Sequence, residues 1–122
     1  MNIPKFDKDG NHILNESYKE ILALDKMLTD ANISHSLDRY FDGWQIIYPE
    51  DGEKRVMDAI EHFGSYGNEA DKLEIMGLLT PEEEEEELDC VLGHLTAQEV
   101  FDRINAHYQA HYDELTGFKK EV

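Results

Sequence analysis

Two histidines near the carboxyl end of the chain, His107 and His111, are spaced one helical turn apart, and Glu114 follows them. Imidazole and carboxylate groups at this spacing on a helix can share one metal ion. A complete site needs a further ligand from elsewhere, and His111 falls on the apolar face of the predicted helix, beside Tyr108 and Tyr112. The pattern is more typical of histidines packed among tyrosines, so we expect no metal site and no cofactor.

The single cysteine, Cys90, is a second candidate for chemistry. A thiol becomes a good nucleophile when a neighbouring base or a helix terminus lowers its pKa. His94 lies four residues on, and in an extended strand this spacing separates the two residues by more than about 13 Å. We therefore expect Cys90 to be a buried structural thiol. The sequence also has no Ser-His-Asp order, P-loop or dinucleotide fingerprint, so it gives little support for an enzyme.

A glycine-rich break, Gly64-Ser65-Tyr66-Gly67, has residue types suited to a small ligand. Glycines let backbone N–H groups approach a ligand closely, while a hydroxyl and an aromatic ring could hold a base or a sugar. The residues predicted to line such a pocket are Gln45, Tyr48, Ser65, Tyr66 and Glu74. The alternative, which we favour, is a bulged strand end whose tyrosine packs in the core.

The strongest signal is the net charge of −17, from 28 acidic and 11 basic residues among 122. Such a field repels nucleic acid and anionic membranes, so we expect neither to be a partner, and it favours encounter with basic protein surfaces. The simplest interpretation is solubility, and the functional one is an acidic surface that occupies a basic groove of another protein. The residues predicted to form this surface are Asp58, Glu61, Glu82, Glu83, Glu84, Glu85, Glu86, Glu87 and Asp89.

Length and apolar content predict a single domain over 1–122, with loop-like or frayed segments at 1–15 and 117–122. Hydrophobic residues make up 40% of the chain, which is too many for a disordered one. No apolar run approaches the roughly 20 residues of a membrane span, and the first residues show no signal-peptide pattern. Because one cysteine cannot form an intrachain disulfide, we expect a cytoplasmic location, in a reducing cytosol.

Two main helices are predicted, because apolar residues repeat at helical spacing over 16–31 and 96–115. The first is expected to begin with Ser17 and Glu20 as a capping box, or with Asn15 as the cap.

A short helix is predicted to begin at Thr80-Pro81-Glu82-Glu83, with threonine as the cap and proline in the first helical position. Glu83 is expected to close a capping box with Thr80. Thr96 and Glu99 have the same spacing at the start of the last helix.

A β-hairpin is predicted where 34–41 and 44–48 alternate apolar and polar residues around Asp42-Gly43. This dipeptide suits a two-residue turn between antiparallel strands. We expect Phe41 and Trp44 to be at least half buried in this hairpin.

The rest of the predicted sheet is less regular. The segment 54–63 fits a helix or a strand, and the turn before it favours a third strand. The segment 73–79 is interpreted as a buried stretch, and 88–95 as a fourth strand. Together these elements predict an α+β fold, in which two main helices cover one face of a four-stranded, mostly antiparallel sheet.

Four stretches of this sequence carry a resemblance to a known group of proteins. They are Phe41-Asp42-Gly43-Trp44-Gln45-Ile46-Ile47-Tyr48, Gly64-Ser65-Tyr66-Gly67, Leu73-Glu74-Ile75-Met76-Gly77-Leu78 and Leu95-Thr96-Ala97-Gln98-Glu99-Val100. In these the chain resembles small, uncharacterised acidic proteins encoded by phages and prophages of Gram-positive bacteria. The resemblance implies no catalytic residues. It implies a genomic context in which genes of this size commonly encode counter-defence proteins.

We therefore expect a non-enzymatic phage accessory protein that acts in the host cytosol. Its acidic surface would inhibit a host defence factor by mimicking nucleic acid in a basic groove. One alternative is a sponge that sequesters a small nucleotide signal in the pocket around the glycine-rich break. Another is an accessory protein for the structure or assembly of the virion.

Overall fold

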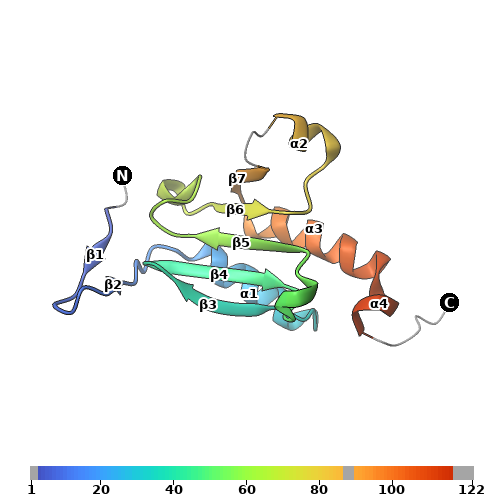
Figure 1. Ribbon diagram of the computed structural model, residues 1–122, viewed down its shortest axis with the longest axis horizontal. Coiled ribbons are helices and arrows are strands. Elements are labelled where there is room, and N and C mark those ends of the chain that lie inside the picture. Colours follow the sequence, from blue (N-terminus) through green and yellow to red (C-terminus); the bar gives the residue numbers. More distant parts are fainter. Residues whose placement is uncertain (1–2, 87–89, 117–122) are drawn as a thin grey trace.

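The computed structural model describes residues 3–86 and 90–116, and its main element is an antiparallel sheet of five strands (Figure 1). The strands are β3 (Ser36–Tyr40), β4 (Gly43–Tyr48), β5 (Met57–Glu61), β6 (Leu73–Met76) and β7 (Val91–Leu95). They lie in the sheet in chain order, so that each pairs with the next. A separate two-stranded hairpin near the amino terminus consists of β1 (Lys5–Phe6) and β2 (His12–Ile13).

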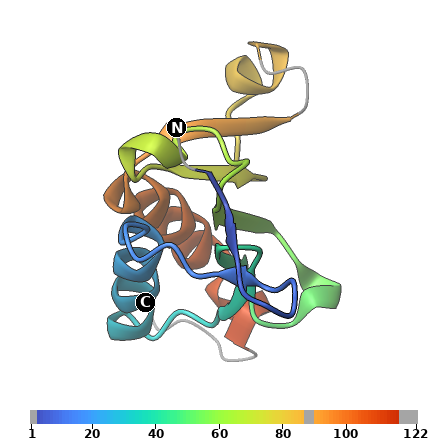
Figure 2. The same cartoon turned by 90° about the vertical axis from the view of Figure 1, so that its left-hand side faces the viewer.

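Two helices, α1 (Glu20–Asp30) and α3 (Ala97–Ala110), lie side by side against one face of the sheet (Figures 1 and 2). The short helix α4 (Tyr112–Thr116) follows α3 after a break at His111. Another short helix, α2 (Pro81–Glu86), lies in the connection between β6 and β7. It projects beyond the edge of the sheet that β7 forms (Figure 1).

The predicted α+β class is confirmed, but the sheet has five strands where four were expected. The additional strand is β6, which was expected only as part of a buried segment. Its residues alternate, with Leu73 and Ile75 fully buried and Met76 exposed. A short apolar run cannot be assigned to a strand by periodicity alone, and the pairing of β6 with β5 and β7 decides it. The expected loop over 1–15 likewise contains the β1–β2 hairpin.

The predicted hairpin around Asp42-Gly43 is confirmed as β3 and β4, and the strand expected within 54–63 is confirmed as β5. Trp44 packs partly buried against the core. Phe41 is 48% exposed, so it only just reaches the expected half burial.

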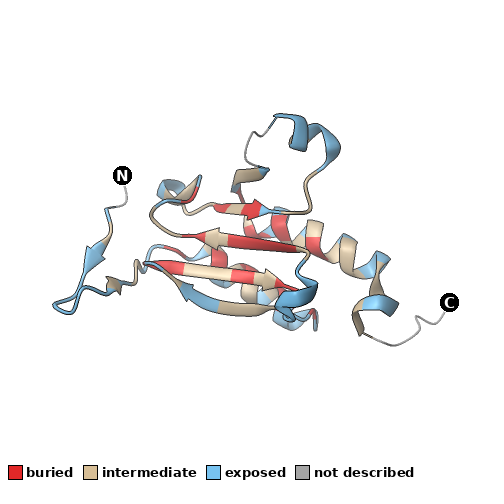
Figure 3. Cartoon of the chain, in the orientation of Figure 1, coloured by how far each residue is buried: buried red, intermediate tan, exposed pale blue. Residues whose placement is uncertain are grey.

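The hydrophobic core lies between the sheet and the two long helices (Figure 3). Every second residue of β4, β5 and β6 points into it, since side chains alternate between the faces of a strand. Burying one isoleucine, leucine or valine side chain contributes roughly 1.5–3 kcal/mol. The core residues are Ile21, Leu24, Leu28, Ile33, Ile46, Tyr48, Met57, Ala59, Leu73, Ile75, Leu95, Ala97, Val100 and Ile104.

Two of the three predicted helix starts are confirmed. At α2, Glu83 N–H donates to Thr80 Oγ1 at 3.2 Å, and Thr80 N–H donates to Glu83 Oε1 at 2.8 Å. At α3, Thr96 and Glu99 form the same capping box. The expected single helix over 96–115 is interrupted at His111, where the backbone leaves helical geometry.

The start of α1 differs from the prediction. The helix begins at Glu20, and its first N–H groups are capped by a side chain from the β5–β6 connection. Asp71 Oδ1 accepts from Lys19 N–H at 2.9 Å and from Glu20 N–H at 3.0 Å. The expected caps do not act in this way, because Asn15 instead accepts from Ser17 N–H in a local turn.

Candidate functional site

The face of the sheet opposite α1 and α3 carries several of the predicted site residues, and we call it the open face. Within residues 3–86 and 90–116 no helix lies across it, and it is turned toward the viewer in Figures 1 and 3. Directly opposed residues of antiparallel strands share a face, so the strand register places them in rows. One row is Asp38, Gln45, Ile60 and Glu74, and the next is Ser36, Ile47, Asp58, Met76 and Val91.

A polar network joins the two rows. Gln45 Nε2 donates to Asp58 Oδ2 at 2.8 Å, and Arg55 Nη2 donates to the same oxygen at 2.6 Å. Asp58 is only 8% exposed. It was expected to belong to the acidic surface, and the structure corrects this, because its charge is covered and paired with Arg55.

Glu74 lies on the open face beside this network. Its Oε1 accepts from Tyr66 N–H at 3.0 Å. Burial raises the pKa of Glu74 above its usual value, the hydrogen bond from Tyr66 opposes that rise, and the negative charge of Asp58 adds to it. Three residues of the predicted pocket, Gln45, Tyr66 and Glu74, are therefore neighbours of this network.

The other two residues of the predicted pocket are engaged elsewhere. Tyr48 is fully buried on the helix side of the sheet, where its hydroxyl lies 2.8 Å from His107 Nδ1. Burial raises the pKa of Tyr48 to about 12. The Ser65 hydroxyl accepts from His62 N–H at 3.0 Å and donates to His62 O at 2.9 Å. The five predicted residues therefore do not line one pocket.

The glycine-rich break packs against β7. Tyr66 is 54% exposed, so the favoured expectation of a tyrosine in the core is wrong. Gly67 adopts a φ of 97°, and His94 N–H donates to Tyr66 O at 3.2 Å. A Cβ atom at Gly93 would lie 2.3 Å from Tyr66 Cβ. The glycines thus allow the close approach of this turn to β7.

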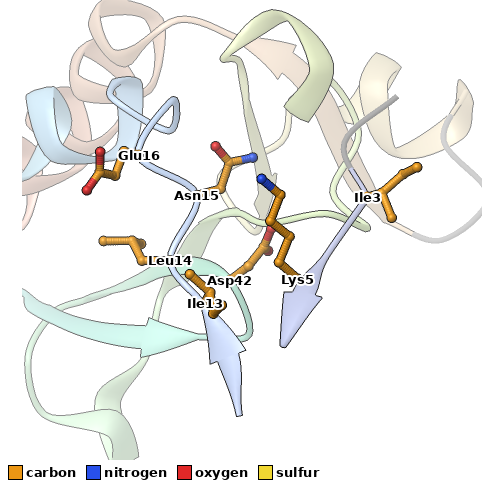
Figure 4. A pocket seen from close by; sticks show the side chains of 7 residues that line it. All are labelled: Ile3, Lys5, Ile13, Leu14, Asn15, Glu16 and Asp42. Atoms are coloured by element: carbon orange, nitrogen blue, oxygen red, sulfur yellow. The ribbon is translucent and has the colours of Figure 1, made fainter. Parts of the chain in front are cut away.

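A cavity of about 580 Å³ lies apart from these residues, beneath the β1–β2 hairpin (Figure 4). Its lining residues are Ile3, Lys5, Ile13, Leu14, Asn15, Glu16 and Asp42. The Asp42 carboxylate is already satisfied, because it accepts from Phe63 N–H at 2.9 Å and from the Tyr18 hydroxyl at 3.3 Å.

Glu61 was also expected on the acidic surface, and this too is corrected. It is fully buried on the helix side of the sheet, where Oε1 accepts from Ile21 N–H at 3.3 Å. Its Oε2 has no hydrogen-bond partner among the described residues. Burial, reinforced by the hydrogen bond and charge of Asp71, raises the pKa of Glu61 to about 9. Glu61 is therefore a neutral acid at pH 7 and carries no surface charge.

The remaining acidic candidates are Glu82 to Glu87 and Asp89. Glu82, Glu84, Glu85 and Glu86 are exposed, whereas Glu87 and Asp89 lie outside the described residues.

Glu83 differs from the other glutamates of α2, because Arg103 of α3 donates to both of its carboxylate oxygens at 2.7 and 2.6 Å. Those hydrogen bonds hold the pKa of Glu83 down at about 2. Arg103 also donates to Leu78 O at 3.0 Å. Residues 78 and 83 are both bound by one arginine, and the sequence pattern did not indicate this contact.

The other chemical candidates are the pair His107 and His111, and Cys90. The His107 and His111 rings stack at 4.4 Å, and burial lowers the pKa of His107. Cys90 is exposed, so the expectation of a buried thiol is wrong. The physical reason is its position in a turn before β7, where its φ is 57°, instead of within a strand.

In the described part of the chain, no group of three or more histidine, cysteine or acidic side chains is placed to hold a metal ion. None of the described helices combines the length and apolar character needed to cross a membrane. No protein-family model, curated protein or solved structure matches this chain.

Proposed function

We propose that this chain is a non-enzymatic binding protein that holds a basic partner protein through the exposed glutamates of α2. One observation carries the proposal. None of the six residues Pro81–Glu86 is buried, so α2 adds nothing to the core. The helix is nevertheless held in place by the Glu83–Arg103 pair and by its capping box with Thr80. We infer that its exposed glutamates serve a contact outside the chain.

The charge supports a basic partner. Glu82, Glu84, Glu85 and Glu86 project into solvent from a protein of net charge −17. Binding through such groups rests on many weak electrostatic contacts, which speed association at low salt and weaken as salt rises.

A nucleic-acid-binding protein is the partner class that we propose, because its basic groove is built to receive closely spaced negative charges. A host defence factor is our first candidate within that class, in line with the resemblance to phage-encoded proteins. The nucleotide sponge has less support, since Tyr48 and Ser65 already use their hydroxyl groups within the fold.

A pair of variants with equal charge tests this proposal. The α2 variant carries Glu82→Gln, Glu84→Gln, Glu85→Gln and Glu86→Gln, and it keeps Glu83. The control variant carries Asp9→Asn, Glu16→Gln, Glu50→Gln and Glu53→Gln, which are exposed acids far from α2 in the sequence. Each variant removes four negative charges.

The assay is capture of proteins from a Gram-positive bacterial lysate on the immobilised protein, followed by elution with duplex DNA and mass spectrometry. We expect the wild type and the control variant to capture the same DNA-displaced protein, and the α2 variant to lose it. Equal capture by all three proteins would refute the role of α2. Loss of capture in both variants would mean that capture depends on the net charge of the protein and not on α2.

A further inference from the structure

The open face carries three apolar side chains among its polar residues, and no described helix lies over them. Ile47 of β4 and Ile60 of β5 are half-buried, and Met76 of β6, across Asp58 from Ile47, is 48% exposed. A sheet normally packs each of its apolar faces against another layer. On the opposite face α1 and α3 supply that layer (Figure 2).

Acidic groups flank these apolar side chains on both sides. Asp38 lies on β3 and Glu74 on β6, in the same row as Ile60. Within the described residues, neither carboxylate has a cation at ion-pair distance. The arginine at this face, Arg55, is already paired with Asp58. The open face therefore has a surplus of negative charge, which a basic partner would balance.

The spacing of these groups fits one helix. Asp38 and Glu74 are separated by three strand spacings, which is about 14 Å at roughly 4.8 Å for each spacing. A helix with its side chains is about 10–12 Å across. A helix that runs along β4 and β5 would place an apolar stripe on Ile47 and Ile60, and its flanking lysines or arginines over the two carboxylates.

We propose that the open face binds an amphipathic, basic helix of the partner protein. This inference rests on the proposed function, and it specifies how the same partner docks. The helix becomes a third layer, packed on the sheet as α1 and α3 are on the other face. The apolar contact supplies affinity that survives high salt, while Asp38 and Glu74 select a helix with cations on both flanks.

Two synthetic peptides of identical composition are suitable probes. One is a helix of leucine and lysine with its leucines on a single stripe, and the other has the same residues in scrambled order. A site that recognises only charge would bind both peptides equally, whereas the open face should bind the striped peptide more tightly. Fluorescence anisotropy at low and high salt measures both affinities, and circular dichroism checks that each variant is folded.

Open-face variants and matched controls locate the binding. Met76→Ser removes the exposed apolar side chain, and Leu22→Ser is its control, because Leu22 is 40% exposed on α1. Asp38→Asn with Glu74→Gln removes the flanking charges. The glutamine still accepts the N–H of Tyr66, so the turn is preserved. We expect each open-face variant to weaken binding of the striped peptide at least tenfold, and Leu22→Ser to leave it unchanged.

The outcomes separate this inference from the proposed function. If the scrambled peptide binds as tightly as the striped one, or if the open-face variants bind normally, the helix inference is overturned. In those cases the proposed function is still supported if the α2 variant fails to capture the DNA-displaced protein. If the open-face variants lose the striped peptide while the α2 variant still captures the DNA-displaced protein, the inference stands and the role of α2 is refuted.

Discussion

Glu61→Gln is the change that tests the buried acid most directly. Glu61 is fully buried, and its pKa is raised to about 9. At pH 7 the folded protein therefore holds a proton on this carboxyl group that the unfolded chain has released. Glutamine is nearly the same shape and does not titrate. It can still accept from Ile21 N–H and can direct its amide toward Asp71, so we expect the variant to fold.

The size of the effect follows from linkage between proton binding and folding. The stability contributed by the protonated Glu61 is fully present below its unfolded pKa of about 4.5, and it is lost as pH rises toward about 9. Over that window the free energy of unfolding falls by about 1.4 kcal/mol for each pH unit. The glutamine variant lacks this term. Its stability relative to the wild type should therefore increase by about 2.7 kcal/mol between pH 6 and pH 8.

Urea unfolding of both proteins at pH 6, 7 and 8 measures this difference. Glu50→Gln, at an exposed position, is the control, and its stability should run parallel to that of the wild type. Subtracting the two curves cancels the other titrating groups that the proteins share. If the wild type and Glu61→Gln change in parallel with pH, Glu61 is ionised in the folded state and the reasoning is refuted.

Three further predictions concern the parts of the fold that support the site. Gly93→Ala should lower the free energy of unfolding, measured in urea, by about 1–3 kcal/mol, because the new methyl group would overlap Tyr66. An unchanged free energy of unfolding would mean that the turn containing Tyr66 moves freely. Arg103→Ala should release Glu83, so that a carboxyl titration followed by NMR finds its pKa back near the ordinary value; a pKa still near 2 would contradict the pairing. Phe101→Ala should cost less than the 3–5 kcal/mol typical of a fully buried ring, because Phe101 is only partly buried; a larger loss in urea unfolding would show that it lies deeper in the core.

Local signals predicted those elements whose stabilising contacts lie close together in the sequence. The Asp42-Gly43 turn joins two alternating strands, and the structure has a hairpin there. The boxes that begin with Thr80 and Thr96 need only a partner three residues on, and both form. In each case a few consecutive side chains supply the hydrogen bonds or the turn geometry, so the pattern alone is sufficient.

The tertiary structure decided the features that depend on which segments meet. Asp71 caps α1 from the connection between β5 and β6, although the two segments are far apart in the sequence. The same fold places Glu61 in the core and leaves Glu82, Glu84, Glu85 and Glu86 in solvent. Both kinds of position are occupied by glutamate, so residue type could not distinguish them.

The open face shows the same division. Strand alternation separates Asp38, Gln45 and Ile47 from the residues of the opposite face, and this much the sequence determined. Which of the two faces the helices cover depends on the packing of α1 and α3 against β4, β5 and β6. The physical reason is that burial and pairing belong to a residue's three-dimensional neighbours, whereas the sequence specifies only its chemistry and its neighbours along the chain.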